Sequence, residues 1–208
     1  MKITILGPTG PTGRQLVAQA LARGHEVTAF ARRPAGLPGH RGLITVPGSI
    51  ADEAALDGAI AGRDAVLCAL GGRPWRRNER VCSTAMRHAI ASMQHHHVRR
   101  LVAISTFGAG ETRSRLGWLV RHLLFGVVLR SEVADKEAME ALLENSGLDW
   151  TVVRVGLLHD GPPRGAWRAA DDGSIEGMGR IARADVAAFM LDQVDDTSWL
   201  RRKPALMD

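Results

Sequence analysis

The chain has 208 residues, of which 45% are hydrophobic and 24% are charged, and this balance excludes a disordered or low-complexity chain. Two cysteines, Cys68 and Cys82, exclude a disulfide framework and a four-cysteine metal site, and are typical of a reducing compartment. The longest apolar run, residues 116–129, is too short for a membrane span and contains Arg121 and His122. Because no charged and apolar leader precedes the first predicted strand, we expect a cytoplasmic protein without a membrane segment.

The net charge of +5, from 27 basic and 22 acidic residues, raises the question of nucleic-acid binding. The arginines are spread along the chain, however, and no helix-turn-helix or zinc-finger spacing accompanies them. We therefore expect a small-molecule ligand and no nucleic acid, with a few arginines serving an anionic cofactor. No metal site is predicted: the run His95, His96, His97 is expected to follow a helix C-terminus, and adjacent side chains point apart unless the helix has already ended.

Short apolar runs alternate with amphipathic segments along most of the chain. Strands are predicted at residues 2–6, 27–31, 43–46, 65–70, 101–105 and 150–155. Helices are predicted around residues 16–21 and 55–60, and over residues 81–93, 131–145 and 184–191. This alternation is typical of an α/β fold with a parallel sheet covered on both faces. We therefore predict a single domain over residues 1–208 with a doubly wound parallel sheet.

The motif GPTGPTGR joins the first predicted strand to the first predicted helix. In such a turn Gly7 permits a sharp bend, Gly10 leaves room for a pyrophosphate, and Gly13 lets the helix pack closely on the sheet. Backbone N–H groups at the helix N-terminus then face the phosphates. The strand–helix–strand setting predicts a dinucleotide site with contacts from Gly7, Thr9, Gly10, Pro11, Thr12 and Gly13.

The end of the second predicted strand indicates which dinucleotide binds. An NAD site usually has Asp or Glu there, whereas this chain has Arg32 and Arg33. A carboxylate would repel a ribose 2′-phosphate, and a guanidinium binds it through paired hydrogen bonds. We therefore predict NADP(H), with Arg32 at the 2′-phosphate, while one of the two arginines can equally be a solvated loop residue.

A series of motifs extends almost from end to end: GPTGPTG, VTAFAR, PGSI, DAVLCALGG, RLVAISTFGAG, ADKEAMEALLENSGLDWTVVR, HDGP and RIARADVAAFML. In this order they resemble atypical short-chain dehydrogenases of the NAD(P)-binding, NmrA-like kind, and most of all flavin reductase/biliverdin reductase B-type proteins. The resemblance implies a Rossmann-like fold. It also implies that Ser49 and Ile50 lie at the adenine, that Ala69, Leu70 and Gly71 lie at the nicotinamide-side ribose, and that Ser105, Thr106 and Phe107 lie beside the nicotinamide.

The chain departs from these relatives mainly on the substrate side. Leu157 stands where flavin reductase-type relatives tend to have a histidine, and His159 follows two residues later. Arg154 and Val155 replace the usual Arg-Pro, and Ser49 replaces an aspartate after the third strand. These departures concern the flavin substrate more than the cofactor.

Typical short-chain dehydrogenases use a Tyr-x-x-x-Lys pair, but this chain contains no tyrosine, and Glu132 stands four residues before Lys136. Lys136 is a candidate for ordering the nicotinamide ribose and for catalysis. The alternative is a solvated lysine paired with Glu140 one turn later.

Without a strong acid, hydride transfer to a flavin or quinone is favoured, because the reduced anion of such an acceptor is delocalised. Catalysis then rests mainly on holding two rings together. Ser105 or Thr106 is a candidate to donate a hydrogen bond, and His159 is a candidate to deliver a proton.

The predicted substrate walls are the segments of about residues 72–80, 106–130 and 156–180. Their apolar side chains, which suit a flat ligand, include Trp75, Phe107, Trp118 and Leu157. Residues 116–129 are expected to form a lid, a buried helix or a dimer contact, in a monomer or weak homodimer. The predicted function is an NADPH-dependent reductase of a flavin, quinone or related planar carbonyl. The alternatives are a tailoring enzyme for a polycyclic aromatic intermediate and a non-catalytic NADP(H)-sensing regulator.

Overall fold

The structure, a computed structural model, describes residues 1–71 and 80–208. Its strands are β1 Lys2–Leu6, β2 Glu26–Ala31, β3 Leu43–Pro47, β4 Ala65–Cys68, β5 Arg100–Thr106, β6 Asp149–Val155, β7 Leu157–His159, β8 Arg168–Ala170, β9 Arg180–Ala182 and β10 Ala205–Met207. Its α-helices are α1 Pro11–Ala22, α2 Glu53–Ile60, α3 Val81–His95, α4 Arg130–Glu144 and α5 Arg183–Asp192. A 3₁₀-helix, η1 Gly110–Arg115, and a π-helix, η2 Val120–Val128, lie between β5 and α4.

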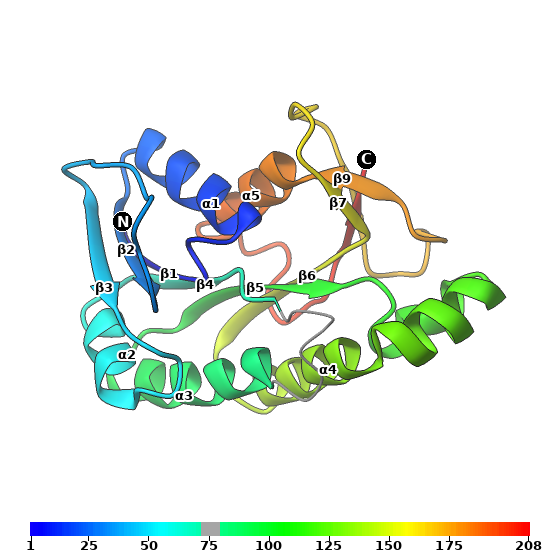
Figure 1. Cartoon of the computed structure of the whole chain (residues 1–208), viewed down its shortest axis with the longest axis horizontal. Coiled ribbons are helices and arrows are strands. Elements are labelled where there is room, and N and C mark those ends of the chain that lie inside the picture. The colour runs from blue at the N-terminus through cyan, green and yellow to red at the C-terminus, as the bar shows by residue number, and fades with distance from the viewer. Residues whose placement is uncertain (72–79) are drawn as a thin grey trace.

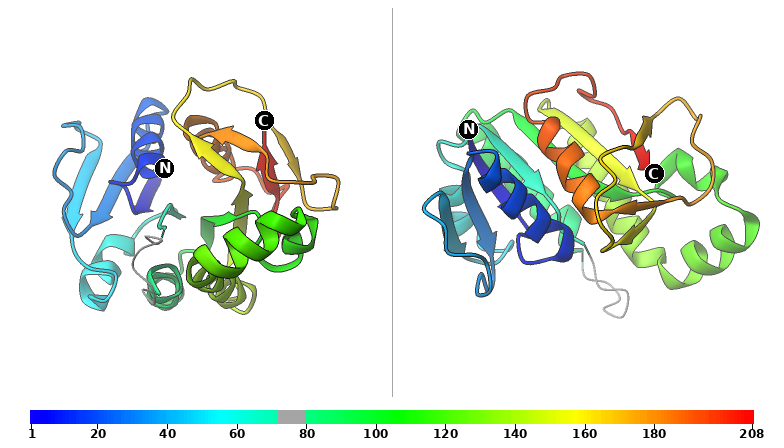
Figure 2. Two further views of the ribbon diagram at one scale, coloured as in Figure 1. Left: turned by 45° about the vertical axis from the view of Figure 1, so that its right-hand side comes forward. Right: turned by 90° about the horizontal axis from the view of Figure 1, so that it is seen from above.

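A twisted, mostly parallel sheet forms the middle layer, in the strand order β3-β2-β1-β4-β5-β6-β10-β8. Helices α1 and α5 cover one face, and α2, α3 and α4 cover the other (Figures 1 and 2). Strand β1 pairs in parallel with β2 on one side and with β4 on the other, so the chain winds outward in both directions from β1. The predicted doubly wound α/β fold is therefore confirmed, and its switch point lies between β1 and β4, where ligands bind in such sheets.

Burial on both faces explains why the central strands are continuous apolar runs rather than alternating ones. All four residues of β4 are buried, as are four of the five in β1. On one face Leu16 and Val17 of α1 pack with Met190 of α5. On the other face Leu56 of α2 and Met139 of α4 belong to one apolar layer, which Met86 of α3 also joins. These two apolar layers hold the carboxyl ends of the strands at one edge of the sheet.

Several elements differ from the prediction. The fourth strand ends at Cys68, two residues earlier than predicted. In the second half of the chain, long-range pairing forms the three-residue strands β7 to β10, which were not predicted. Residues 116–129 do not form a buried helix. Phe125 is buried there, but five side chains project into solvent: Trp118, Leu119, Leu123, Val127 and Val128.

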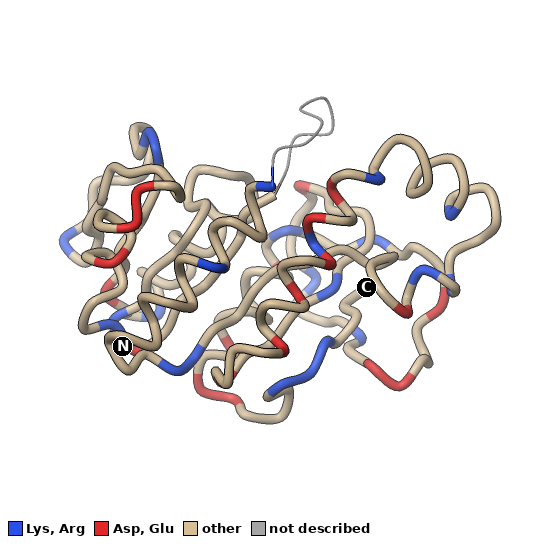
Figure 3. Tube along the Cα trace, turned by 90° about the horizontal axis from the view of Figure 1, so that it is seen from below, with Lys and Arg blue, Asp and Glu red and all other residues tan. Residues whose placement is uncertain are grey.

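Charged residues are scattered along the chain trace, with Asp and Glu positions between those of Lys and Arg (Figure 3). In the two described ranges of the chain, the structure contains no helix with the length and apolar character of a membrane span.

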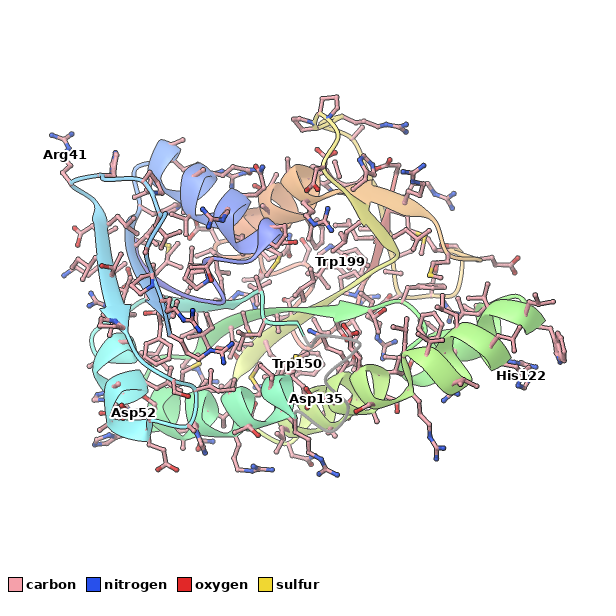
Figure 4. The ribbon with its side chains drawn as sticks, in the orientation of Figure 1. Arg41, Asp52, His122, Asp135, Trp150 and Trp199 are labelled. Atoms are coloured by element: carbon pink, nitrogen blue, oxygen red, sulfur yellow. The ribbon has the colours of Figure 1, made fainter. Side chains whose placement is uncertain are left out.

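A buried carboxylate joins helices α3 and α4. Asp135 of α4 accepts hydrogen bonds from the backbone N–H groups of Cys82 and Ser83, at 2.8 and 2.9 Å. It also accepts one from the Ser83 hydroxyl at 2.5 Å. Because no side chain of α3 caps its own N-terminus, Asp135 takes that role from the neighbouring helix (Figure 4).

We expect Asp135→Ala to destabilise the protein, because two buried amide groups lose their acceptor. The expected loss in the free energy of unfolding is on the order of 3 kcal/mol, measured by urea denaturation. Asp192→Ala is the control, because it removes an exposed ion pair with Arg23 and is expected to cost less than about 1 kcal/mol. Equal stability of the two variants would contradict this role of Asp135.

Candidate functional site

Two adjoining cavities lie at the carboxyl edge of the sheet. The first, of about 280 Å³, lies over the ends of β1 and β2 and beside the loop after β3. The second, of about 680 Å³, lies over the ends of β4, β5 and β6. Thr9 and Leu70 line both cavities, so the two share a border next to the glycine loop.

The cavities bring together most of the predicted cofactor residues. The first is lined by Gly7, Thr9, Arg32, Ser49, Ile50 and Leu70, together with Leu6, Phe30, Ala31, Gly48 and Val81. The second is lined by Thr9, Gly10, Pro11, Thr12, Ala69, Leu70, Gly71, Ser105, Thr106 and Lys136. The same cavity is also bordered by Ile104, Glu132, Val155, Gly156, Leu157, Leu158 and Arg183.

The glycine loop has the geometry that its spacing predicts. Gly7 turns the chain with φ +81°. A Cβ added to Gly13 would lie 2.0 Å from the Gly7 carbonyl oxygen, so helix α1 approaches β1 this closely only with glycine there. A Cβ added to Gly10 would meet nothing nearer than the Gly7 carbonyl oxygen, at 3.5 Å. Gly10 therefore leaves open the space on the cavity side of the loop.

The N-terminus of α1 faces the second cavity and carries no side-chain cap. Pro11 occupies the first turn, where its missing N–H costs the helix nothing. The next backbone N–H groups, with the positive end of the helix dipole, are therefore left for an anion.

Arg32 and Ser49 both line the first cavity, and the contact of Arg32 with a 2′-phosphate stays a prediction. Both arginines are exposed, and Arg33 borders neither cavity. Sequence reasoning did not identify Arg14, whose Nε donates to the Thr9 carbonyl at 3.1 Å and whose Nη1 donates to the Gly36 carbonyl at 2.6 Å. Its place as the last residue of GPTGPTGR is the signal that was available.

Lys136 is buried, and its ammonium group joins two strand ends. Its Nζ donates to the carbonyl oxygens of Leu70, at 2.8 Å, and Ile104, at 2.7 Å. The alternative of a solvated lysine paired with Glu140 is wrong, because Glu140 is itself buried and binds Arg154 at 2.6 Å.

The hydroxyl of Ser105 is committed to this buried network. It donates to Glu140 Oε1 at 2.6 Å, so its hydrogen faces Glu140 and not the cavity. Burial acts against the charge of Arg154, but the hydrogen bonds that its guanidinium donates to Glu140 and Glu111 outweigh this effect and raise its pKa. Thr106 borders the cavity and its hydroxyl donates to the Phe107 carbonyl at 3.3 Å.

Of the four predicted substrate contacts, one borders the second cavity, two do not, and one lies outside the described residues. Phe107 is fully buried and packs with Leu116 and Phe125, so the prediction that its ring walls the pocket is wrong. Trp118 is 65% exposed and stacks near His122 with ring centroids 5.3 Å apart. Trp75 lies outside the described residues. Leu157 does border the second cavity.

His159 is not placed to deliver a proton to the cavity. It lies on β7, where its Nδ1 accepts from the Gly161 N–H at 3.1 Å and its Nε2 lies 3.7 Å from Asp208. Since β7 pairs with β9, the predicted donor is turned toward the C-terminal segment instead.

Two charged residues of the second cavity were missing from the predicted site. Arg183 begins α5 and donates to Asp160 at 2.8 Å. Glu132, in the first turn of α4, is partly buried. Burial raises the pKa of Glu132, the charge of Lys136 acts against this, and that of Asp135 adds to it. The spacing of Glu132 from Lys136 was the signal that could have identified it.

His95 and His96 do not point apart as expected, because α3 ends at His95. Both imidazoles reach Asp57 of α2, His95 Nδ1 at 3.6 Å and His96 Nε2 at 2.8 Å. Hydrogen bonds, first from His96 and then from Ser92, lower the pKa of the Asp57 carboxyl group. One ligand atom from each of Asp57, His95 and His96 lies within 4.8 Å of the others.

Comparisons with known proteins agree with this geometry. A family model described as NAD(P)H-binding matches residues 7–197. A curated relative, (4-alkanoyl-5-oxo-2,5-dihydrofuran-3-yl)methyl phosphate reductase from Streptomyces griseus, is 31% identical over 153 residues, which cover 73% of this chain and 46% of the relative. The chain also spans only 18% of a 3-beta-hydroxysteroid dehydrogenase from Mycolicibacterium neoaurum, 40% identical over 66 residues.

Solved structures share the fold. ChuY, an anaerobillin reductase from Escherichia coli O157:H7, has a TM-score of 0.84 at 22% identity, covering 100% of this chain and 97% of its own. A short-chain dehydrogenase/reductase from Veillonella parvula in complex with NADP has a TM-score of 0.82 at 19% identity, covering 100% of this chain and 94% of its own.

We expect Gly10→Ala to fold normally but to weaken dinucleotide binding at least about tenfold, or by about 1.4 kcal/mol. The reason is that its new methyl group fits the loop but fills the space facing the cavity. Calorimetric titration with NADPH and a thermal melt measure the two effects. Gly58→Ala on α2, where an added Cβ meets no atom within 4 Å, is the matched control and is expected to bind like wild type. Wild-type affinity in Gly10→Ala would contradict this geometry.

Proposed function

We propose that this chain, which belongs to the NAD(P)H-binding family, is an NADPH-dependent reductase that delivers hydride to a planar conjugated acceptor, such as a conjugated carbonyl, quinone or flavin. The observation that carries this proposal is the pair of adjoining cavities around the glycine loop. A cation stands in each of them, Arg32 in the first and Lys136 in the second. A dinucleotide that carries a phosphate at its adenosine end and a reactive ring at the other matches this arrangement.

The described residues fit such a cofactor at each of its parts. The uncapped N-terminus of α1 suits the pyrophosphate. Arg32 suits the 2′-phosphate, because guanidinium and phosphate form paired hydrogen bonds. Lys136, held over the ends of β4 and β5, suits the nicotinamide-side ribose. When bound, the reduced nicotinamide supplies a hydride.

The walls of the second cavity support an apolar and conjugated acceptor. Ile104, Val155, Leu157 and Leu158 contribute apolar surface around the polar groups of Thr106 and Lys136. We assign the acceptor side to this wall and to the neighbouring segments 106–130 and 156–180. The name of the Streptomyces griseus relative describes a ring carbonyl conjugated with a C=C bond, which supports acceptors of this class.

We expect Arg32→Ala to weaken NADPH binding by about 10- to 100-fold, because a charge-assisted hydrogen bond contributes about 1.5–3 kcal/mol. NADH has no 2′-phosphate, so its affinity is expected to stay within a factor of about 3 of the wild-type value. Calorimetric titration with each cofactor measures both. Arg33→Ala is the matched control, because that side chain borders neither cavity. Equal losses for both cofactors, or a larger effect of Arg33→Ala, would overturn the role of Arg32.

A screen of quinones, flavins and conjugated ketones with NADPH tests the reductase itself. Oxidation of NADPH in the presence of an acceptor, followed by its loss of absorbance, is the expected result. If the protein binds NADPH and reduces none of these classes, the reductase proposal fails and the sensor alternative is favoured.

A further inference from the structure

Glu132 and Lys136 share one helix face that borders the second cavity. They are four residues apart on α4, a spacing that places side chains one above the other along a helix. The same cavity is bordered by Thr106 at the end of β5 and by Leu157 on β7. The Glu132 carboxyl group therefore stands beside the space that we assign to the acceptor.

Among the buried or half-buried acids in the part of the chain that the structure describes, Glu132 differs from the others in lacking a fixed partner. Glu140 binds Arg154 and Ser105. Asp185 accepts from the backbone N–H groups of Arg164 and Gly165. Within residues 1–71 and 80–208, by contrast, no hydrogen bond or ion pair engages the Glu132 carboxylate. Because withdrawing a carboxylate from water without a partner is costly, this group suits an exchange of protons with a ligand.

The charges around Glu132 come from its own helix and from the opposite wall. Lys136 and Asp135 lie on α4, and Arg183 borders the cavity from α5. The ammonium of Lys136 is held by two carbonyl oxygens, and Arg183 donates to Asp160. Both cations are thus engaged elsewhere, which leaves Glu132 as the titratable group of this wall that is free to serve the acceptor.

We propose that Glu132 is the proton donor of the reduction, protonating the oxygen of a conjugated carbonyl acceptor as that oxygen gains negative charge. This rests on the proposed function. The hydride brings two electrons and one proton to the acceptor and leaves oxidised NADP⁺. The C=O π bond, or the conjugated C=C–C=O system, is broken, a C–H bond forms, and Glu132 supplies the second proton. The resulting carboxylate recovers a proton from water in the open cavity.

This assignment widens the range of acceptors beyond flavins and quinones. The hydroxyl of Ser105 is bound to Glu140 and that of Thr106 to a carbonyl, so neither is a strong acid placed for this task. A carboxyl group at the position of the missing tyrosine supplies the acid that a ketone or enone requires. Acceptors whose reduced anions are delocalised, such as flavins and quinones, need a protein acid far less.

The experiment compares wild type with Glu132→Gln, which keeps the size and removes the exchangeable proton. Reduction of a conjugated ketone, benzalacetone, is expected to lose about 10²- to 10⁴-fold in kcat. Reduction of the quinone menadione, and calorimetric affinity for NADPH, are expected to change less than about tenfold. The control is Glu137→Gln, which makes the same charge change on the same helix and is expected to behave like wild type. The side chain of Glu137 accepts a hydrogen bond from the Gly110 N–H.

A second measurement does not depend on turnover. Carbon NMR of the glutamate side-chain carboxyls, titrated against pH, is expected to show one signal, absent in Glu132→Gln, with a pKa above the ordinary glutamate value. Because the protonated form is the donor, kcat for the ketone is expected to fall as pH rises through that same value.

The outcomes separate this proposal from the function on which it rests. If wild type binds no NADPH or reduces neither acceptor, the proposed function fails. If wild type reduces the ketone and Glu132→Gln does so equally well at every pH, only the role of Glu132 fails. A Glu132 signal that titrates at or below the ordinary glutamate value overturns the role as well. Should the glutamine variant not fold, Glu132→Asp, which keeps the acid, is expected to retain ketone reduction and a shifted pH profile.

Discussion

The buried ammonium of Lys136 holds helix α4 to the edge of the sheet on which the site is built. An ammonium group withdrawn from water is costly unless its protons are satisfied, and here the carbonyl oxygens of Leu70 and Ile104 satisfy two of them. Leu70 lies two residues beyond β4 and Ile104 lies near the end of β5, so one side chain fixes a helix against the edge where both strands end. Lysine suits this point because its compact ammonium group presents several donors, and two of them meet these carbonyl oxygens.

Other polar residues of α4 extend the same constraint in different directions. Asp135 faces the N-terminus of α3, and Glu140 faces Ser105 and Arg154 on β5 and β6. Such bonds are directional and strong away from water. Each one therefore fixes the rotation of the helix about its own axis as well as its distance from the sheet. Glu132 also lies on α4, but it borders the cavity and, among the described residues, its carboxylate is bound to no other element.

The parts of the site predicted from sequence are those that local backbone geometry determines. The glycine spacing of residues 7–13 and the cation at Arg32 follow from one strand, one turn and one helix, and both lie on the cavities. The errors concern side chains whose surroundings come from distant segments. Phe107 is buried by Leu116 and Phe125, and His159 is drawn toward Asp208 by the pairing of β7 with β9. No periodicity in the sequence encodes those contacts.

The acidity of Glu132 is a balance between effects that this arrangement sets separately. Burial raises its pKa, the charge of Lys136 lowers it, and the charge of Asp135 raises it again. In a Tyr-x-x-x-Lys pair the lysine makes a weak acid stronger. Here Lys136, at the same spacing, opposes the rise in pKa that burial causes in Glu132. A carboxyl group is in any case a stronger acid than the phenol of a tyrosine. Because Lys136 and Asp135 are each held by other elements, the geometry that fixes α4 also places the charges that shift the pKa of the group facing the acceptor.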